Sequence, residues 1–283
     1  MGLRINTNVP SLVAQRNLRM TRGGLDKSYE RLSSGHRINH AGDDAAGLAI
    51  SESLRAQMRG LRQAERNSQD GISLVQVAEG AVSEISNILI RMRELGVQSA
   101  SDTIGQTERG FINNEFQSLL EEIDRIAQST EFNGVKLLNG SKSNFEVQIG
   151  TRNNAFVDRV KLFENNPADL NTVALGLNLA SLGDKLGAQN SLGLIDGAIN
   201  QVTTIRAGFG AMQNRLESVV NNIQTSRENL AAANSRIKDT DIAEESTELA
   251  KHQILMQSGV SVLGQANTTM KVALNLLGQG GGG

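Results

Sequence analysis

The chain is notable first for the residue types that it lacks. Its 283 residues include no cysteine, no tryptophan, one tyrosine and two prolines. Without cysteine there is no disulfide framework and no thiolate chemistry. Aromatic residues make up only 3% of the chain, so its core must be built from many small aliphatic contacts, as in long helix bundles. The two prolines, Pro10 and Pro167, leave room for long uninterrupted helices.

The charge balance and the distribution of apolar residues exclude two classes of partner. Lys and Arg number 28 against 30 Asp and Glu, which gives a net charge of -2 and no electrostatic case for nucleic-acid binding. No apolar run approaches the roughly 18 residues of a membrane-spanning helix, so we expect no membrane insertion. The N-terminus has no continuous apolar core and no cleavage-like site, which is unlike a Sec signal.

Apolar residues at steps of three, four and seven predict long helices on both sides of a middle region. The first helix covers 5–32. After a polar break, the run from Leu54 to Leu95 fits one helix of about 55 residues, roughly 80 Å long. A shorter helix covers 112–126, and the pattern returns over 195–237. Helices of this length are typical of coiled coils and bundles rather than of compact domains.

The middle region holds the β signal. Asn-Gly occurs at 133–134 and again at 139–140, which is a strong turn signal. "NFEVQIG" alternates apolar and polar residues as a half-buried strand does, and "AFVDRVKLF" is its expected partner. We therefore predict a small β-hairpin unit over about 133–165, followed by an irregular stretch to about residue 187.

The last segment has the pattern of a coiled-coil seam of four heptads. Its residues at steps of seven, with two companion positions, are Leu249, Met256, Leu263, Met270 and Leu277, with Val260 and Leu274. The terminal "GQGGGG" is expected to be too flexible to continue the helix. The predicted fold is mainly α: a long coiled-coil or bundle rod with a small β-hairpin unit and with the N- and C-terminal helices paired. Two such helices are marginal alone and should need copies in neighbouring subunits.

The polar break "RLSSGHRINHAGDD" has the composition of a possible metal site. His36 and His40 stand near Asp43 and Asp44. Against a metal site, the surrounding residues do not favour a helix, and the pattern matches neither a zinc-protease motif nor a calcium loop. We therefore expect a connector in which Gly35 and Gly42 let the chain turn, and in which Asp43 or Asp44 caps the next helix.

Catalytic motifs are missing from the chain. No serine stands in a nucleophile elbow, and the terminal glycines precede no helix that could hold a phosphate. We expect no catalytic residue, no metal and no cofactor. The arginine cluster in "LIRMRELGVQSA" has two readings that the residues leave open: a solvated helix face with close ion pairs, or a surface for a partner.

Taken in order along the chain, several segments resemble the bacterial flagellins. "INTNVPSLVAQRNL", "RLSSGHRINHAGDDAAGLAIS" and "RQAERNSQDGISLVQVAEGAVSEI" resemble the N-terminal signature of that family. "RAGFGAMQNRLES", "RENLAAANSRIKDTDIAEES" and "SVLGQAN" resemble the C-terminal signature. The runner-up is a hook–filament junction protein, a family that shares the terminal segments but departs more from the central signatures.

The resemblance implies a structural subunit that self-assembles into the helical filament of the bacterial flagellum. It implies an inner-core domain made of 1–42 and 241–283, a connector at about 33–43, and a helical rod over 43–240. The span from Leu170 to Ser191 is too short for a variable outer domain or an inserted enzyme. Export would follow a type III route, and the filament would lie outside the cytoplasm, whether bare, sheathed or periplasmic.

The resemblance also implies partners. These are further copies of the chain, an export chaperone, the filament cap and the hook-junction proteins. Recognition by Toll-like receptor 5 would use Arg91, Leu95 and Glu115, which we expect to be exposed in the monomer. Gly96 stands where the family often has Ala, which would weaken the helix locally by up to about 1 kcal/mol.

Overall fold

A computed structural model describes residues 7–141, 145–162 and 169–279. These residues form two compact units, one made of 1–56 with 230–283 and the other of 57–229. We describe each unit by itself. Ile5 of the first predicted helix and the last four glycines of the tail lie outside the described residues, as do the side chains of Met270, Leu274 and Leu277.

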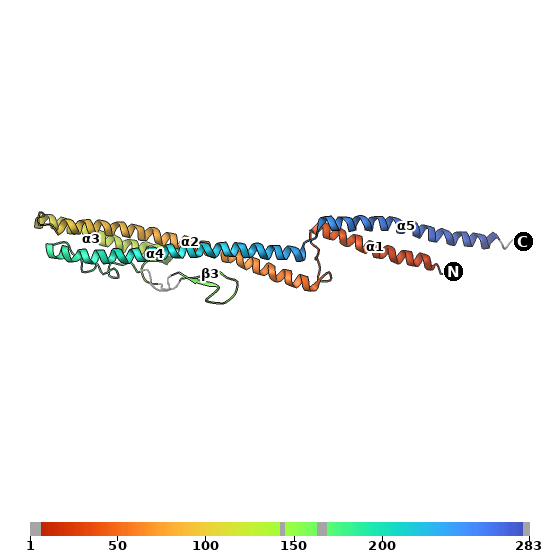
Figure 1. The fold of residues 1–283 in the computed structure, drawn as a ribbon, viewed down its shortest axis with the longest axis horizontal. Coiled ribbons are helices and arrows are strands. Elements are labelled where there is room, and N and C mark those ends of the chain that lie inside the picture. The colour runs from red at the N-terminus through yellow and green to blue at the C-terminus, as the bar shows by residue number, and fades with distance from the viewer. Residues whose placement is uncertain (1–6, 142–144, 163–168, 280–283) are drawn as a thin grey trace. The chain divides into compact units, whose positions relative to one another are not determined.

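Most of the described chain is helical, as the periodicity predicted (Figure 1). The elements in chain order are α1 (Val9–Ser34), α2 (Ala45–Ser99), α3 (Gln106–Ser129), β1 (Glu131–Phe132), β2 (Val135–Lys136), β3 (Glu146–Gln148), β4 (Arg159–Lys161), α4 (Lys185–Lys238) and α5 (Ile242–Gln279). At 55 residues, α2 has the predicted length. The tail was expected to stop the helix at Gly278, but α5 continues to Gln279. No helix in the described ranges combines the length and the apolarity needed to cross a membrane.

In the first unit, α1 and α5 lie side by side (Figure 1), which confirms the predicted pairing of the terminal helices. The Asn8 side chain accepts a hydrogen bond from the Ser11 N–H and so caps the start of α1. The helix ends at Gly35, whose φ of 72° is left-handed and whose N–H donates to the Arg31 carbonyl. Glycine suits this position because a side chain there would be strained.

The break after α1 is joined to the break before α5 by backbone hydrogen bonds. The Arg37 N–H donates to the Lys238 carbonyl at 2.7 Å, and the Thr240 N–H donates to the Gly35 carbonyl at 3.1 Å. Between these bonds the connector places Ile38 inward, where it is only 1% exposed. The predicted connector is therefore an ordered segment, since its backbone groups are paired within the protein.

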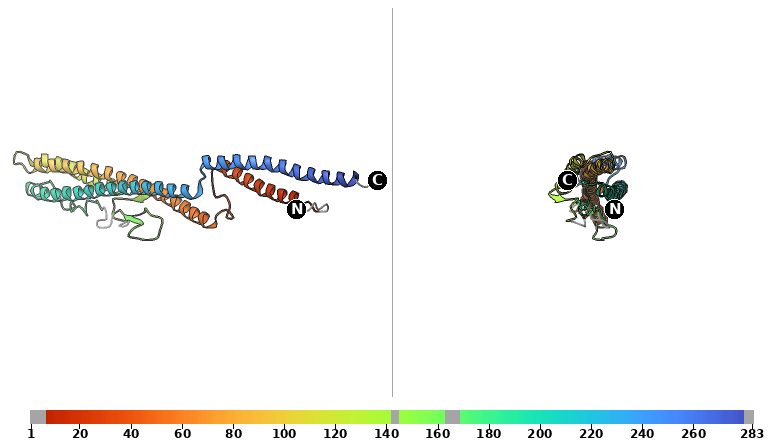
Figure 2. Two further views of the ribbon diagram at one scale, coloured as in Figure 1. Left: turned by 45° about the vertical axis from the view of Figure 1, so that its right-hand side comes forward. Right: turned by 90° about the vertical axis from the view of Figure 1, so that its left-hand side faces the viewer.

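The second unit contains the hydrophobic core. Figures 1 and 2 show α2, α3 and α4 running side by side in this unit. Their facing sides supply the largest fully buried side chains, among them Ile85, Leu89, Met92, Phe116, Ile123 and Ile195. Two aromatic rings, those of Phe116 and Phe209, lie among the aliphatic residues of the buried core. This agrees with a core built mainly from small aliphatic contacts.

The β residues form two separate hairpins rather than one unit. β1 and β2 pair through Phe132 and Val135 around the turn Asn133-Gly134, where both residues have positive φ as the Asn-Gly signal predicts. β3 and β4 pair with Val147 opposite Val160, which confirms the predicted partners. The second Asn-Gly makes no hairpin turn, because Asn139 instead forms an isolated bridge with Asp169.

The irregular stretch before α4 packs along α3 instead of forming a domain of its own. Leu170, Leu177 and Leu182 on this stretch are fully buried. The Asp124 carboxylate of α3 accepts hydrogen bonds from the Thr172 N–H at 2.8 Å and from its hydroxyl at 2.9 Å. This packing leaves no large outer domain in the described part of the chain.

Candidate functional site

The contact between α1 and α5 is a seam of small side chains interspersed with leucines such as Leu18 and Leu25. On α1 the positions turned away from solvent include Ser11, Ala14, Thr21, Gly24 and Ser28. Of the apolar residues in the predicted stripe of this helix, Val9, Leu12 and Tyr29 are 51%, 54% and 49% exposed, whereas Leu18, Leu25 and Leu32 are half-buried. The larger apolar residues of α1 are thus divided between half-buried and exposed positions.

On α5 the seam includes every described residue at the predicted steps of seven. Leu249, Met256 and Leu263 are half-buried, and so are His252, Gly259 and Ala266, which lie three residues after each of them. Val260, the predicted companion position, is 58% exposed. The sequence did contain a signal for the second row, because His252, Gly259 and Ala266 also recur at steps of seven.

Two glycines allow the helices to approach closely. A Cβ added at Gly24 would lie 2.6 Å from the imidazole Cε1 of His252, and one added at Gly259 would lie 2.9 Å from the Leu18 side chain. Neither position has space for a methyl group unless the neighbour moves. Gly24 and His252, which the sequence reasoning did not select, therefore fit together as a small residue facing a large one.

Hydrogen bonds set the register of the two helices. The Asn8 amide donates to the Ala266 carbonyl at 3.1 Å, and the Ser11 hydroxyl donates to Asn267 Oδ1 at 3.0 Å. At the other end, Arg31 pairs with the buried Glu245 at 3.3 Å. These bonds tie both ends of α1 to α5.

Large apolar side chains remain exposed on both helices. On α1 they include Val9, Leu12, Val13 and Met20, which line an open groove of about 620 Å³ together with Arg16 and Arg19. On α5 they are Ile242, Ile254, Leu255, Val260, Val262 and Val272. Two rows of exposed apolar residues on neighbouring helices are typical of a protein–protein contact surface.

The connector aspartates Asp43 and Asp44 make different interactions. Asp44 caps α2, because its carboxylate accepts the Gly47 N–H at 2.8 Å. Asp43 faces back and pairs with Lys27 of α1 at 2.6 Å, while it accepts the N–H groups of His40 and Asn39. The hydrogen bond from Lys27 and those two N–H groups hold the pKa of Asp43 well below its usual range.

The two connector histidines point to different partners. His36 Nδ1 lies 3.2 Å from Asp239 Oδ1, and His40 Nε2 lies 2.8 Å from Glu30 Oε1. Across the described ranges there is no group of three or more His, Cys, Asp or Glu side chains that could hold a metal ion. The histidines and aspartates of the break therefore link the connector to its neighbours in the first unit.

The arginine cluster of α2 forms ion pairs at the surface of the second unit. Arg91 contacts Glu115 of α3 at 2.9 Å and Glu94 at 3.0 Å, and these carboxylates raise its pKa. Arg93 contacts Asp196 of α4 at 2.7 Å. The ion-paired helix face that we considered for this cluster is therefore present.

The expectation that Leu95 is exposed is wrong. Leu95 is only 2% exposed, because it continues the core-facing row of Leu89 and Met92. Arg91 and Glu115 remain about half exposed. Gly96 lies inside an unbroken α2, and a Cβ there would lie 3.0 Å from Leu192 of α4. The glycine thus allows close packing at this point of the helix.

Family models match most of the chain, and individual relatives match nearly its full length. The family model of the bacterial flagellin N-terminal helical region matches residues 5–143, and that of the C-terminal helical region matches residues 192–277. A flagellin of Halalkalibacterium halodurans is 45% identical over 96% of this chain and 99% of its own length. A flagellar filament 33 kDa core protein of Treponema phagedenis is 41% identical over 96% of this chain and 99% of its length.

A solved structure from Vibrio parahaemolyticus, described as a flagellar hook-associated protein, superposes with a TM-score of 0.56. It covers 70% of this chain and 100% of its own, at 15% identity. At that identity the likeness concerns the fold alone. The full-length similarity is to flagellins, so it favours a filament subunit over a junction protein.

The paired terminal helices with exposed apolar rows, and the separate helical unit with its own core, define a structural protein that assembles with copies of itself. The chain belongs to the bacterial flagellins. It is a non-enzymatic subunit of the flagellar filament, the structure used for motility, and residues 7–141, 145–162 and 169–279 contain no large outer domain.

Proposed function

We propose that the chain assembles through its termini, with 1–42 and 241–283 forming the inner core of the filament, 33–43 the connector and 43–240 the rod. This proposal rests on the rows of large apolar residues that α1 and α5 leave exposed beside the seam between the two helices. The pair of helices cannot bury these residues by itself, so the gain in burial comes from neighbouring copies.

The predicted assembly seam fits this division of surfaces. Leu249, Met256 and Leu263 hold α5 against α1, whereas the exposed Val260 is available to a second copy. We assign Met270, Leu274 and Leu277 to the same seam from their heptad positions. In the connector, Gly35 ends α1, Gly42 lies in the turn before α2, Asp43 pairs with Lys27, and Asp44 caps the start of α2. A head-to-tail contact that does not close then generates an open helical filament.

Seeded polymerisation tests this proposal. We expect purified monomer to extend filament seeds, and we expect a chain truncated after Gly259 to lose this ability, because it lacks the second half of α5. A chain truncated after Leu277, which loses only the glycine-rich tail, is the matched control. Normal elongation by the chain that ends at Gly259 would refute the inner-core assignment. Negative-stain microscopy separates long tubes from the short capped oligomers of a junction protein.

The same exposed rows suit the partners that the family resemblance implies. An export chaperone would cover the apolar residues of α5 before assembly, because exposed rows of this kind favour association. The filament cap and the hook-junction proteins would meet the same surfaces at the ends of the filament. Competition between the chaperone and seeds for the monomer is a direct measurement of this overlap.

We further propose that Arg91 and Glu115 form a contact for Toll-like receptor 5. Both are exposed and joined by a 2.9 Å ion pair, so they present a fixed polar patch. Leu95 supports this patch from the core, since it is buried beneath the helix surface. In a receptor reporter assay Arg91→Ala should reduce the response to monomer more than Arg93→Ala, whose partner is on α4. Equal responses to the two variants would argue against this contact.

A further inference from the structure

The loop between β3 and β4 is held in one shape although its side chains lie outside. The Gln148 amide donates to the Arg152 carbonyl at 2.9 Å. The buried Asp158 accepts the Asn154 N–H at 3.0 Å, and Asn154 Oδ1 in turn accepts the Phe156 N–H at 3.0 Å. These bonds order the loop before any partner arrives, which lowers the entropy lost on binding.

At its tip the loop presents an aromatic ring, an aliphatic side chain and a cation. Phe156 is 97% exposed and Val157 is 69% exposed. Arg152 is also exposed, and its guanidinium contacts no hydrogen-bond or ion-pair partner in the described ranges. Aromatic residues and arginine are the types that dominate binding energy at protein interfaces. We call residues 150–158 the knob.

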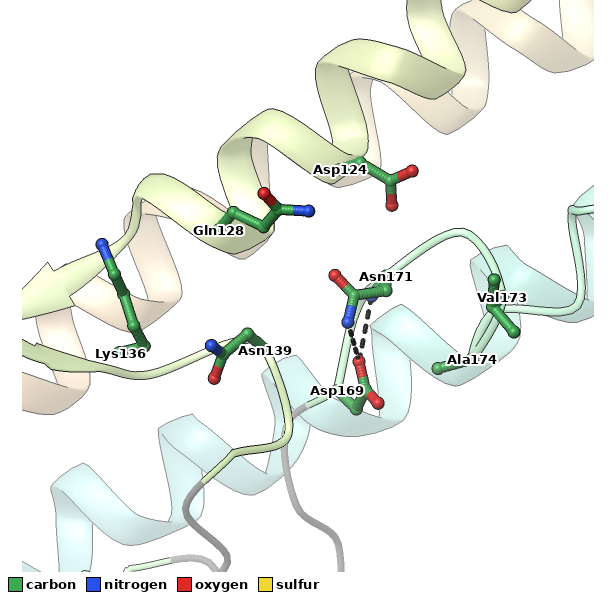
Figure 3. A pocket seen from close by; sticks show the side chains of 8 residues that line it. All are labelled: Asp124, Gln128, Lys136, Asn139, Asp169, Asn171, Val173 and Ala174. Carbon is green, nitrogen blue, oxygen red and sulfur yellow. Dashed lines mark hydrogen bonds between the residues drawn. The ribbon is translucent and has the colours of Figure 1, made fainter.

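A polar cavity on the same unit has the complementary chemistry (Figure 3). It measures about 790 Å³ and lies between the end of α3 and the stretch before α4. Asp124 and Gln128 line it from α3, and Asp169, Asn171 and Val173 line it from the stretch. We call this cavity the socket.

The socket has an excess of hydrogen-bond acceptors. Asn171 Oδ1 is buried without a partner, because the Asn171 amide N–H₂ is turned toward Asp169, to which it donates at 2.7 Å. Figure 3 shows the Asn171 amide nitrogen turned toward Asp169, beside the open space of the cavity. The carboxylates of Asp124 and Asp169 line this space, with Lys136 as the cation among the lining residues. Two carboxylates at one hollow favour a donor cation, and a guanidinium offers five N–H groups.

The socket also has an apolar wall. Val173 is 71% exposed, and the neighbouring Ala174 is exposed as well. If an arginine of a partner bound beside the aspartates of the socket, an apolar residue next to that arginine would lie against this wall. The knob carries such a neighbour in Phe156, four residues beyond its free arginine.

A chain cannot fill its own socket with its own knob. α3 runs antiparallel to α2, and Glu115 of α3 lies beside Arg91 of α2. Asp124 is nine residues further along α3, so along the helix axis it lies beside about residue 82 of α2. The knob lies against α2 near Gly60, where an added Cβ would meet the Thr151 side chain at 2.7 Å. The positions of the socket and of the knob along α2 therefore differ by about 22 helical residues, or roughly 30 Å. The occupant must therefore come from another copy.

We propose that the knob of one copy docks into the socket of a neighbouring copy, with the Arg152 guanidinium on the carboxylates of Asp124 and Asp169, and with Phe156 against Val173. This contact rests on the proposed assembly of the chain with itself. Knob and socket are different surfaces, so the contact is heterologous and repeats without closing, as a filament requires.

Cross-linking between two variants tests the contact directly, because the chain contains no native cysteine. Copies with Val157→Cys, which keeps Phe156, are mixed with copies carrying Val173→Cys, extended from seeds and oxidised. We expect a covalent dimer from the mixture. A mixture in which Leu179→Cys replaces Val173→Cys is the control, since Leu179 is 83% exposed outside the socket. Filaments with no more dimer than in this control would overturn the proposal.

Elongation rates provide a second test that does not depend on disulfide formation. We expect Arg152→Ala and Phe156→Ala each to raise the critical concentration for elongation by about tenfold, the effect of one lost charged hydrogen bond or one lost buried apolar side chain. Arg62→Ala, which removes another exposed arginine of the same unit, should leave it unchanged. If Arg152→Ala had the same critical concentration as Arg62→Ala, the knob contact would be overturned, but assembly through the termini would not. Failure of the unmodified chain to extend seeds would instead overturn assembly itself.

Discussion

The two units of this flagellin place their apolar residues in opposite ways. In the unit of 57–229, apolar residues of α2, α3 and α4 meet in one buried cluster that extends from Leu74 to Leu216. In the unit of 1–56 and 230–283, Ile38 is the buried apolar residue among those described, and the remaining buried side chains are polar. The same kind of helix is used in both units, but only one of them completes its core.

This difference suits a polymer subunit that has one unit folded around its own core before assembly. A unit with a closed core keeps its stability before assembly, because its apolar surface is already removed from water. A pair of helices with exposed apolar rows gains most of its burial only when copies associate. The seam between α1 and α5 holds these two helices together while large apolar side chains such as Met20 and Val260 remain exposed. The exposed side chains are therefore available for contact with other copies.

The largest effect should come from emptying the closed core. Phe116→Ala removes a fully buried ring and should lower the free energy of unfolding of the 57–229 unit by about 3–5 kcal/mol. Met20→Ala, at a side chain that is 71% exposed on α1, should leave monomer stability nearly unchanged and slow seeded elongation. Chemical denaturation and elongation rates are the two measurements. If the variants lost similar monomer stability, the contrast between the units would be wrong.

A smaller effect should come from the tight fit in the terminal seam. Gly24→Ala places a methyl group within 2.6 Å of His252 and should destabilise the α1–α5 pair by about 1–3 kcal/mol. Its neighbour Gly23 has no atom within 4 Å of an added Cβ, so Gly23→Ala should stabilise the helix by up to about 1 kcal/mol. Thermal unfolding followed by circular dichroism compares the pair. Equal shifts for the two variants would mean that the seam is loose.

The cap of α2 should contribute less. Asp44→Ala removes the acceptor for the Gly47 N–H and should lower stability by about 1 kcal/mol. Asp44→Asn keeps a capping oxygen and should recover most of that loss. Hydrogen exchange of the first turn of α2 reports the change locally. Unchanged exchange in Asp44→Ala would show that the cap is not needed for this helix start.

The smallest effect concerns acid. The pKa of Asp43 is held below its unfolded value by Lys27 and two backbone N–H groups, so its contribution is present above about pH 4 and is lost as the pH falls through the folded pKa. Hydrogen exchange at His40 should therefore speed up in strongly acidic solution, after correction for the intrinsic rate. Asp43→Asn should remove this pH dependence, and a variant that kept it would point to another group.

Periodicity predicted the helices well because it is a local property of the chain. The limits of α2, the break around Gly35 and the pairing of β3 with β4 all follow from the spacing of apolar residues and from turn signals. The family could also be read from the sequence, since several specific segments occur in the right order. None of these inferences needs the position of a distant residue.

Periodicity was less successful where a choice between neighbouring helix faces had to be made. It placed Leu95 in the apolar row of α2, which the structure buries, whereas the expectation that Leu95 is exposed came from the family resemblance. It selected Val9 and Leu12 along with Leu18 and Leu25 for the apolar stripe of α1, but only Leu18 and Leu25 of these four are half-buried. It also predicted one β unit, although Asn139 pairs with Asp169 instead of forming a hairpin turn.

The sequence by itself determined which segments are helices, where they break, and to which family the chain belongs. Only the tertiary structure decided which face of each helix is covered, because that depends on the partner that lies against it. Gly24 against His252, the exposure of Val9 and Leu12, and the knob and socket on one unit are results of contacts between residues far apart in the chain. A repeat along one helix contains no information about such contacts.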